Sequence, residues 1–252
     1  MTGSKAMSLL YKLLKRSSAL LLCTLVVSQY SYASVIMNGN RIIYSASAKE
    51  KTLQFTNQDP YPNVVQIWLD TNNPRSNPST ADAPFVATPQ VFRMEPNSGQ
   101  AVRLVFTGSG LPQDRESVFY FNFQQIPSVK SSDKDKNKLL LLVSNRLKVF
   151  YRPDSLPGSS DKISDELTFS VKKIQGKTHL VVNNPTAYHA SFTQATITTA
   201  GKSVNVPDVT MVAPKSEVSW PIRSSISVNR SSILQYKLVN DYGVEIKTKY
   251  QF

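Results

Sequence analysis

Short apolar runs that alternate with polar residues, and that end at Pro, Asn, Asp or Ser, recur along most of this 252-residue chain. Leu53 and Phe55 alternate with polar neighbours, and Leu167, Phe169 and Val171 repeat the pattern much later in the chain. No long stretch keeps the 3.6-residue apolar period of an amphipathic helix. The chain is therefore predicted to be all-β and to consist of antiparallel sandwiches.

Residues 152–160 (RPDSLPGSS) are the best candidate for a linker between two domains. They hold two Pro, one Gly and three Ser between strand-like stretches, and proline cannot continue a central strand. We expect one domain over residues 34–153 and a second over residues 161–252, each near the ~100 residues of an immunoglobulin-like sandwich. No internal sequence repeat relates the two halves.

Residues 1–33 have the pattern of a secretory signal peptide. Four basic residues and no acidic residue precede the apolar stretch 19–27, and small residues stand at Ser31 and Ala33. The alternative is a transmembrane helix, which needs about 20 apolar residues, so this stretch is too short. We expect cleavage after Ala33 and a mature chain of residues 34–252.

Charge and cysteine content exclude several classes of protein. The chain has one Cys and two His, too few for a disulfide framework or a Cys/His zinc finger. Residues 34–252 hold 25 basic and 17 acidic residues, a net charge of +8, and no Cys. The densest basic run, residues 130–138, also holds Asp133 and Asp135, so we interpret it as a solvated loop. No cofactor, metal or nucleic-acid partner is predicted.

The run 139–143 (LLLLV) is more apolar than a sandwich strand requires. One face of such a strand normally meets water, yet this run is apolar on both faces. Two explanations stay open at this point. Either a central strand is covered on both sides, or one face is kept for a partner that adds a strand to an exposed edge.

Several segments closely resemble the motifs of the periplasmic chaperones of pilus assembly, the PapD-like family. The segments are LPQDRESVFYFNFQQIP (111–127), KVFYRP (148–153), NPTAY (184–188), NDYG (240–243), ATP (87–89) and MEP (94–96). The resemblance covers essentially all of residues 34–252. It implies two immunoglobulin-like domains in a boomerang arrangement and a non-enzymatic chaperone, which folds and caps pilus subunits by donor-strand complementation and delivers them to an outer-membrane usher.

The resemblance also implies roles for particular residues. Arg41 and Lys148 match the cleft pair that binds the terminal carboxylate of the subunit. Leu139, Leu141 and Val143 match the alternating apolar residues of the subunit-binding strand, which we expect over residues 138–150. Without the motifs, the two cations would be interpreted as charges that keep a strand edge soluble. Self-association through the same strand is left open.

Glu116, Arg152 and Asp241 match an interdomain ion network of the family. The alternative is that these residues are ordinary surface charges, whose ion pairs contribute only about 0–1 kcal/mol each to stability.

Val143 and Lys148 pose a geometric difficulty, because residues five apart face opposite sides of a flat strand. A bulge, a strong twist or a bend between Ser144 and Leu147 would reconcile them.

Two other functions were weighed against the chaperone. A secreted hydrolase has little support, because His179 and His189 are the only histidines and no Gly-x-Ser-x-Gly motif occurs. A sandwich adhesin or structural pilus subunit would lack a complete first-domain sheet or need a ligand pocket, and the complete set of strands before Pro153 argues against it.

Overall fold

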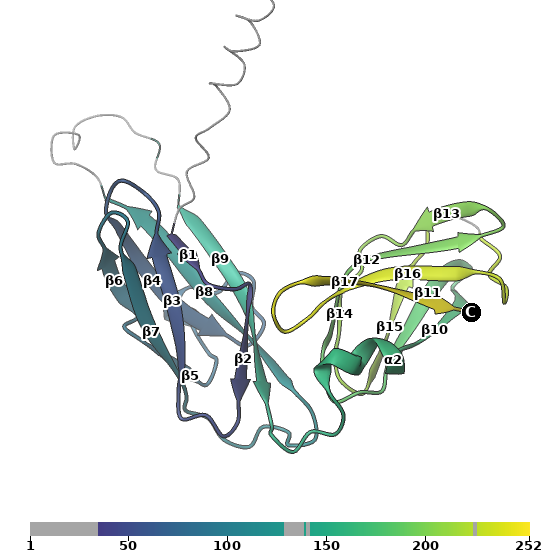
Figure 1. Ribbon diagram of the computed structural model, residues 1–252, viewed down its shortest axis with the longest axis horizontal. Helices are drawn as coiled ribbons and strands as arrows, with labels where there is room; N and C mark the ends of the chain where they lie inside the picture. The colour runs from purple at the N-terminus through teal and green to yellow at the C-terminus, as the bar shows by residue number, and fades with distance from the viewer. Residues whose placement is uncertain (1–34, 129–138, 140–141, 224–225) are drawn as a thin grey trace, which may run out of the picture. The chain divides into compact units, whose positions relative to one another are not determined.

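The computed structural model describes residues 35–128, 139, 142–223 and 226–252, and these form two β-sandwiches (Figure 1). The prediction of an all-β chain with two immunoglobulin-like sandwiches is confirmed. The predicted signal peptide, and Leu141 of the expected subunit-binding strand, lie outside the described residues.

The first sandwich has nine strands in two sheets. One sheet has the order β1-β3-β7-β5, made of β1 (Val35–Met37), β3 (Lys51–Asn57), β7 (Gly99–Phe106) and β5 (Phe85–Thr88). The other has the order β2-β9-β8-β4-β6, made of β2 (Arg41–Ser45), β9 (Val143–Arg152), β8 (Ser117–Pro127), β4 (Asn63–Asp70) and β6 (Val91–Met94). A 3-10 turn, η1 (Pro78–Thr80), follows β4. Strand β2 runs parallel to β9, whereas the other pairs in these sheets are antiparallel.

The second sandwich begins after the 3-10 turn η3 (Ser160–Lys162) and the short helix α2 (Ile163–Glu166). Its smaller sheet has the order β10-β11-β15, made of β10 (Thr168–Ile174), β11 (Lys177–Asn184) and β15 (Ser216–Pro221). Its larger sheet contains β13 (Lys202–Asn205), β12 (Ala190–Thr199), β16 (Ile233–Val239) and β17 (Glu245–Gln251), and β14 (Met211–Val212) pairs with β12.

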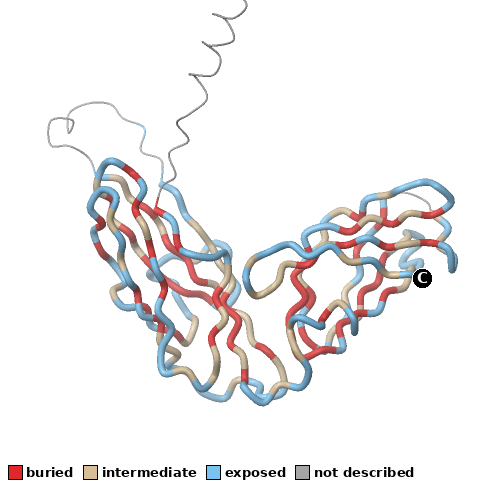
Figure 2. Tube along the Cα trace, in the orientation of Figure 1, coloured by how far each residue is buried: buried red, intermediate tan, exposed pale blue. Residues whose placement is uncertain are grey.

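Each sandwich has its own apolar core, which Figure 2 shows as buried segments along the strands. In the first core Phe55 meets Phe123 edge to face, with ring centroids 5.2 Å apart. Phe123 stands where the resembled family usually has an aliphatic residue, and here its ring is 3% exposed. In the second core Phe192 packs in the same manner on Trp220, at 5.0 Å.

Each sandwich contains a buried asparagine that makes the same set of hydrogen bonds to the main chain, although the two sequences show no repeat. The Asn57 side-chain amide donates to the carbonyls of Tyr61, Met94 and Glu95. The Asn184 side-chain amide donates in the same way to Tyr188, Val212 and Ala213. Each asparagine therefore ties three main-chain carbonyls from different segments to one buried side chain.

Candidate functional site

Strand β9 has an open edge over its first half. On one side, Val143–Leu147 pair with Gln125–Phe121 of β8. On the other side, β2 pairs only with the second half of β9, from Lys148 to Arg152. Within the described part of the chain, no strand pairs with the outer edge of residues 143–147. Their outward main-chain groups are therefore available to another strand.

Exposed apolar side chains lie at the start of this edge and just before it. Leu139 is 86% exposed, Leu142 48% and Val143 45%. For these three residues the first explanation of the apolar run, a strand covered on both sides, is wrong. Leu139 and Leu142 also lie outside β9, which begins at Val143 rather than at residue 138 as expected. Its first residue, Val143, pairs with Gln125 of β8.

The difficulty with Val143 and Lys148 is not resolved by a bulge. The pairing of β9 with β8 runs without a register shift from Val143 to Tyr151. Leu147, Val149 and Tyr151 face the core, so Lys148 faces the opposite side of the sheet. Val143 and Lys148 therefore do not share a face. They mark the two ends of one open edge.

Arg41 and Lys148 lie side by side at the end of that edge. They are direct partners in the parallel pairing of β2 with β9. Burial, and then the positive charge of Arg41, lower the pKa of Lys148. Lys148 has no carboxylate partner within the described residues. Two adjacent cations with no shared anion form a favourable site for a carboxylate.

The Arg41 guanidinium also makes one hydrogen bond to the second sandwich and one to its own neighbour in the first. Its Nη1 donates to the Val239 carbonyl at 2.8 Å, and its Nε donates to Asn40 Oδ1 at 3.3 Å. Burial lowers the pKa of Arg41, although the charges of Asp241 and Glu116 oppose that shift.

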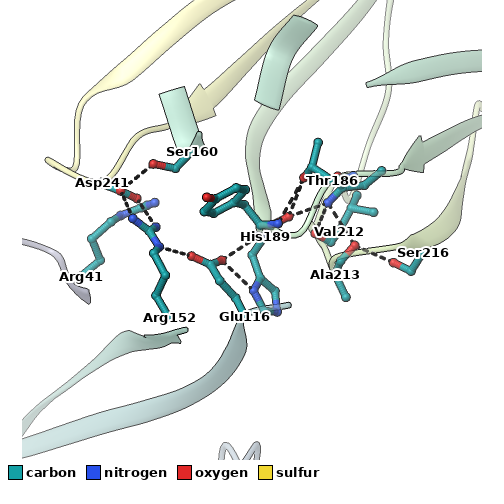
Figure 3. Close-up of polar contacts among 12 residues, drawn as sticks. Arg41, Glu116, Arg152, Ser160, Thr186, His189, Val212, Ala213, Ser216 and Asp241 are labelled. Carbon is teal, nitrogen blue, oxygen red and sulfur yellow. Dashed lines mark hydrogen bonds and ion pairs between the residues drawn. The ribbon is translucent and has the colours of Figure 1, made fainter. Parts of the chain in front are cut away.

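Glu116, Arg152 and Asp241 form one ion network, and its carboxylates come from both sandwiches (Figure 3). Arg152 Nε lies 2.7 Å from Glu116 Oε1, and Arg152 Nη1 lies 2.7 Å from Asp241 Oδ2. Ser160 adds a hydrogen bond to Asp241 at 2.8 Å. The Glu116 side chain is only 2% exposed, so these groups are not ordinary surface charges.

The charges of the network are mutually stabilised. Burial alone would lower the pKa of Arg152, but Asp241 and Glu116 raise it above the ordinary value. Burial alone would raise the pKa of Asp241, but Arg152 and Ser160 lower it. The removal of one member would leave a partly buried charge without its partner, which is strongly unfavourable.

Two further residues of this region make contacts that no sequence motif indicates. His189 is buried, and both its main-chain N–H and its Nδ1 contact Glu116 Oε2, at 2.8 and 3.1 Å. Arg146 of β9 lies over the Tyr120 ring, and its guanidinium pairs with both carboxylate oxygens of the buried Asp70 on β4. Neither contact follows a local period, so only a structure reveals it.

The described residues contain neither a metal-binding cluster nor a membrane-spanning helix. No group of three or more His, Cys, Asp or Glu side chains could hold a metal ion. Of the helices in the same residues, none is both long and apolar enough to span a membrane.

Comparisons with known proteins give a consistent result. Residues 34–157 match the family model "Pili and flagellar-assembly chaperone, PapD N-terminal domain", and residues 162–250 match "Pili assembly chaperone PapD, C-terminal domain". The chain is 34% identical over 237 residues to the probable fimbrial chaperone YadV of Escherichia coli K12, covering 92% of this chain and 96% of YadV. It is 36% identical over 217 residues to the chaperone protein HifB of Haemophilus influenzae, covering 84% of this chain and 86% of HifB.

Solved structures agree with the sequence relatives. The crystal structure of the YadV chaperone has a TM-score of 0.74 at 32% identity and covers 87% of this chain and 100% of its own. The structure named as the periplasmic chaperone SfaE has a TM-score of 0.62 at 26% identity, covering 86% and 98%.

Proposed function

The chain belongs to the pili assembly chaperones, and from this premise we propose that it holds a pilus subunit as an added strand along β9 and binds the subunit's terminal carboxylate with Arg41 and Lys148. The chain is a non-enzymatic fimbrial chaperone rather than an adhesin or a structural subunit, because its family and its curated relatives are chaperones.

One observation carries the proposal: the open edge of β9 ends where two adjacent cations begin. A strand added beside Val143–Leu147 would end at Lys148, because β2 occupies the edge beyond that residue. Because the added strand stops at this point, we assign the carboxylate bound there to the end of the added chain. The added strand would therefore run in the same direction as β9, in line with β2.

Leu139, Leu141 and Val143, which we call the apolar row, would fill the groove of the subunit. Leu139 and Val143 are available for this in the described residues, and Leu141 lies outside them. Burial of three aliphatic side chains contributes roughly 1.5–3 kcal/mol each, so about 5–9 kcal/mol before the cost of association. Each charge-assisted hydrogen bond to the carboxylate contributes about 1.5–3 kcal/mol. The apolar row would thus supply most of the affinity.

The two cations would fix the register of the added strand. A slip by one residue would turn alternate side chains to the wrong face. A carboxylate held at Arg41 and Lys148 prevents such a slip, because the slip would leave both cations half-buried without their anion. We assign the network of Glu116, Arg152 and Asp241 the role of tying the two sandwiches together beside this anchor.

The same proposal includes the cellular route of the protein. Residues 1–33 would direct export, cleavage would follow Ala33, and residues 34–153 and 161–252 would be the two domains. The mature chain would act in the periplasm, as the name of SfaE states for that relative, and would deliver subunits to an outer-membrane usher. In the absence of a subunit, the open edge would pair with a second copy of the chain.

Co-purification with a pilus subunit tests the anchor. The chain and the subunit are expressed together and exported, with Arg41→Ala, Lys148→Ala and the control Lys51→Ala, an exposed lysine of β3. We expect each anchor variant to lose most of the complex, and the control to retain it. Undiminished complexes in both anchor variants would contradict the proposal.

A further inference from the structure

Asn40 lies between the proposed carboxylate anchor and one corner of the second sandwich. It directly precedes β2, and its side chain makes one hydrogen bond in each direction. Its Oδ1 accepts from Arg41 Nε at 3.3 Å, and its Nδ2 donates to the Gly243 carbonyl at 3.0 Å. One amide group therefore connects the Arg41 guanidinium to the turn between β16 and β17.

Gly243 gives Asn40 the space that this bridge requires. A Cβ added at Gly243 would collide with Asn40 Oδ1 and would lie 2.7 Å from its Cγ, closer than real Cβ contacts. Gly243 also has a φ of +82°, in the left-handed region that favours glycine. The residue that the NDYG segment places here is thus the one that permits the close approach.

The turn that carries Gly243 is held in shape by its own hydrogen bonds. The Asn240 side-chain oxygen accepts from the main-chain N–H groups of Tyr242 and Val244, at 3.1 and 2.9 Å. The Gly243 N–H donates to the Asn240 carbonyl at 2.9 Å. Immediately before this turn, the Val239 carbonyl accepts from Arg41 Nη1 at 2.8 Å.

We infer that Asn40 and Gly243 are positioning residues, which hold the Arg41 guanidinium in the orientation that binds the terminal carboxylate. A guanidinium has five N–H donors in a fixed plane. Asn40 and the Val239 carbonyl use one donor on Nε and one on Nη1. The plane is then fixed, and the donors that remain are free for a carboxylate that Lys148 approaches from the adjacent strand.

A guanidinium that is oriented before binding loses less conformational freedom when the ligand arrives. Without Asn40, Arg41 would keep its charge and its place in β2, but would have to find the carboxylate geometry during binding. The expected consequence is weaker carboxylate binding with little change in the stability of the fold.

This inference rests on the proposed function, and acetate serves as a probe of the anchor that requires no identified subunit. Acetate is titrated into the purified mature chain while the NMR signals of the Arg41 Nε–H and Lys148 Nζ groups are followed, with acetamide as the uncharged control. The variants are Asn40→Ala, Gly243→Ala and the two combined. Asn38→Ala, in the same exposed segment, controls for Asn40→Ala. Gly176→Ala controls for Gly243→Ala, because it has a φ of +76° and no atom within 4 Å of the added Cβ.

We expect Asn40→Ala and Gly243→Ala each to weaken acetate binding at least threefold. Both control variants should bind acetate as tightly as the wild type. The melting temperature of Asn40→Ala should stay close to that of the wild type. The combined variant should bind acetate no more weakly than Asn40→Ala alone, since that change removes the three atoms that lie nearest to the new Cβ. If the wild type binds acetate and Asn40→Ala binds it equally well, the positioning role is wrong while the anchor stands. If acetate moves neither signal in the wild type, the anchor itself is wrong and the positioning role with it.

Discussion

Replacement of Lys148 by methionine should stabilise the free chaperone and at the same time abolish subunit binding. Lys148 is half-buried beside Arg41, its direct partner in β2, and forms no ion pair with a carboxylate of the described residues. Burial and the repulsion from Arg41 lower the pKa of Lys148, so its charged form is disfavoured in the folded chain. Methionine keeps the length of the side chain and removes the charge.

The magnitude follows from the partial exposure of the site. After screening by water, the burial cost and the repulsion together amount to about 0.5–1.5 kcal/mol. For a chain of this length, a gain of that size raises the melting temperature by roughly 1–5 °C. The loss of one charge-assisted contact and the unpaired carboxylate should cost the complex about 2–5 kcal/mol.

The stability gained by Lys148→Met should depend on pH. The folded-state pKa of Lys148 lies below its unfolded value of 10.5, so the unfolded chain binds the proton more tightly. The cost is therefore fully present at neutral pH and disappears as pH rises through the lowered pKa toward 10.5. The gain from Lys148→Met should be largest near pH 7 and should vanish above about pH 10.5.

Thermal unfolding from pH 7 to 10.5, together with co-purification of a subunit, tests both halves of the prediction. Lys51→Met is the matched control, because Lys51 is exposed on β3, and its melting temperature should not change. A destabilised Lys148→Met that still captures the subunit would refute the reasoning, because Lys148 would then be structural rather than a ligand for the carboxylate.

Three further predictions concern neighbouring features. Burial would raise the pKa of Asp70, but hydrogen bonds from Arg146, Ser76 and Asn122 lower it to about 2. Asp70→Asn should therefore lower the free energy of unfolding by about 1–2 kcal/mol at pH 7. Acid-unfolding curves should show that this difference shrinks as the pH falls from 3.8 toward 2. Asn184→Ala removes a buried amide that donates to three main-chain carbonyls, so urea unfolding should show a loss of about 1–3 kcal/mol. Val143→Asp should prevent subunit capture in a pull-down. Its melting temperature should change by no more than that of the matched control Val91→Asp, since both valines are exposed.

Local periodicity was sufficient to predict the fold of this chain. The alternation of Leu53 with Phe55 and of Phe169 with Val171 predicted β3 and β10, because a sandwich strand buries every second side chain. The sequence also indicated that residues 139–143 are too apolar for one core. It could not show where the strand begins, because that depends on where β8 stops pairing with it.

The candidate site was less predictable, because its members are distant in sequence. Glu116, Arg152 and Asp241 were identified from the family resemblance and not from any period. His189 carried no motif of its own, and its contact with Glu116 joins residues 73 positions apart. The Asn40–Gly243 bridge spans 203 positions and depends on the absence of a side chain, which no local pattern encodes.

The two sandwiches treat their exposed edges differently, and this contrast supports the assignment of β9 as the binding strand. Strand β17, at the edge of the second sandwich, carries exposed Glu245, Lys247 and Lys249, and such charges discourage pairing with another chain. The open half of β9 has one charged side chain, Arg146, and Asp70 together with the Tyr120 ring holds it against the sheet. The charge that would protect this edge is thus paired within the domain, while the apolar side chains around Val143 remain exposed. An edge that is open, begins at an exposed valine and is limited by two cations at its other end has the properties needed to accept a single strand in a single register.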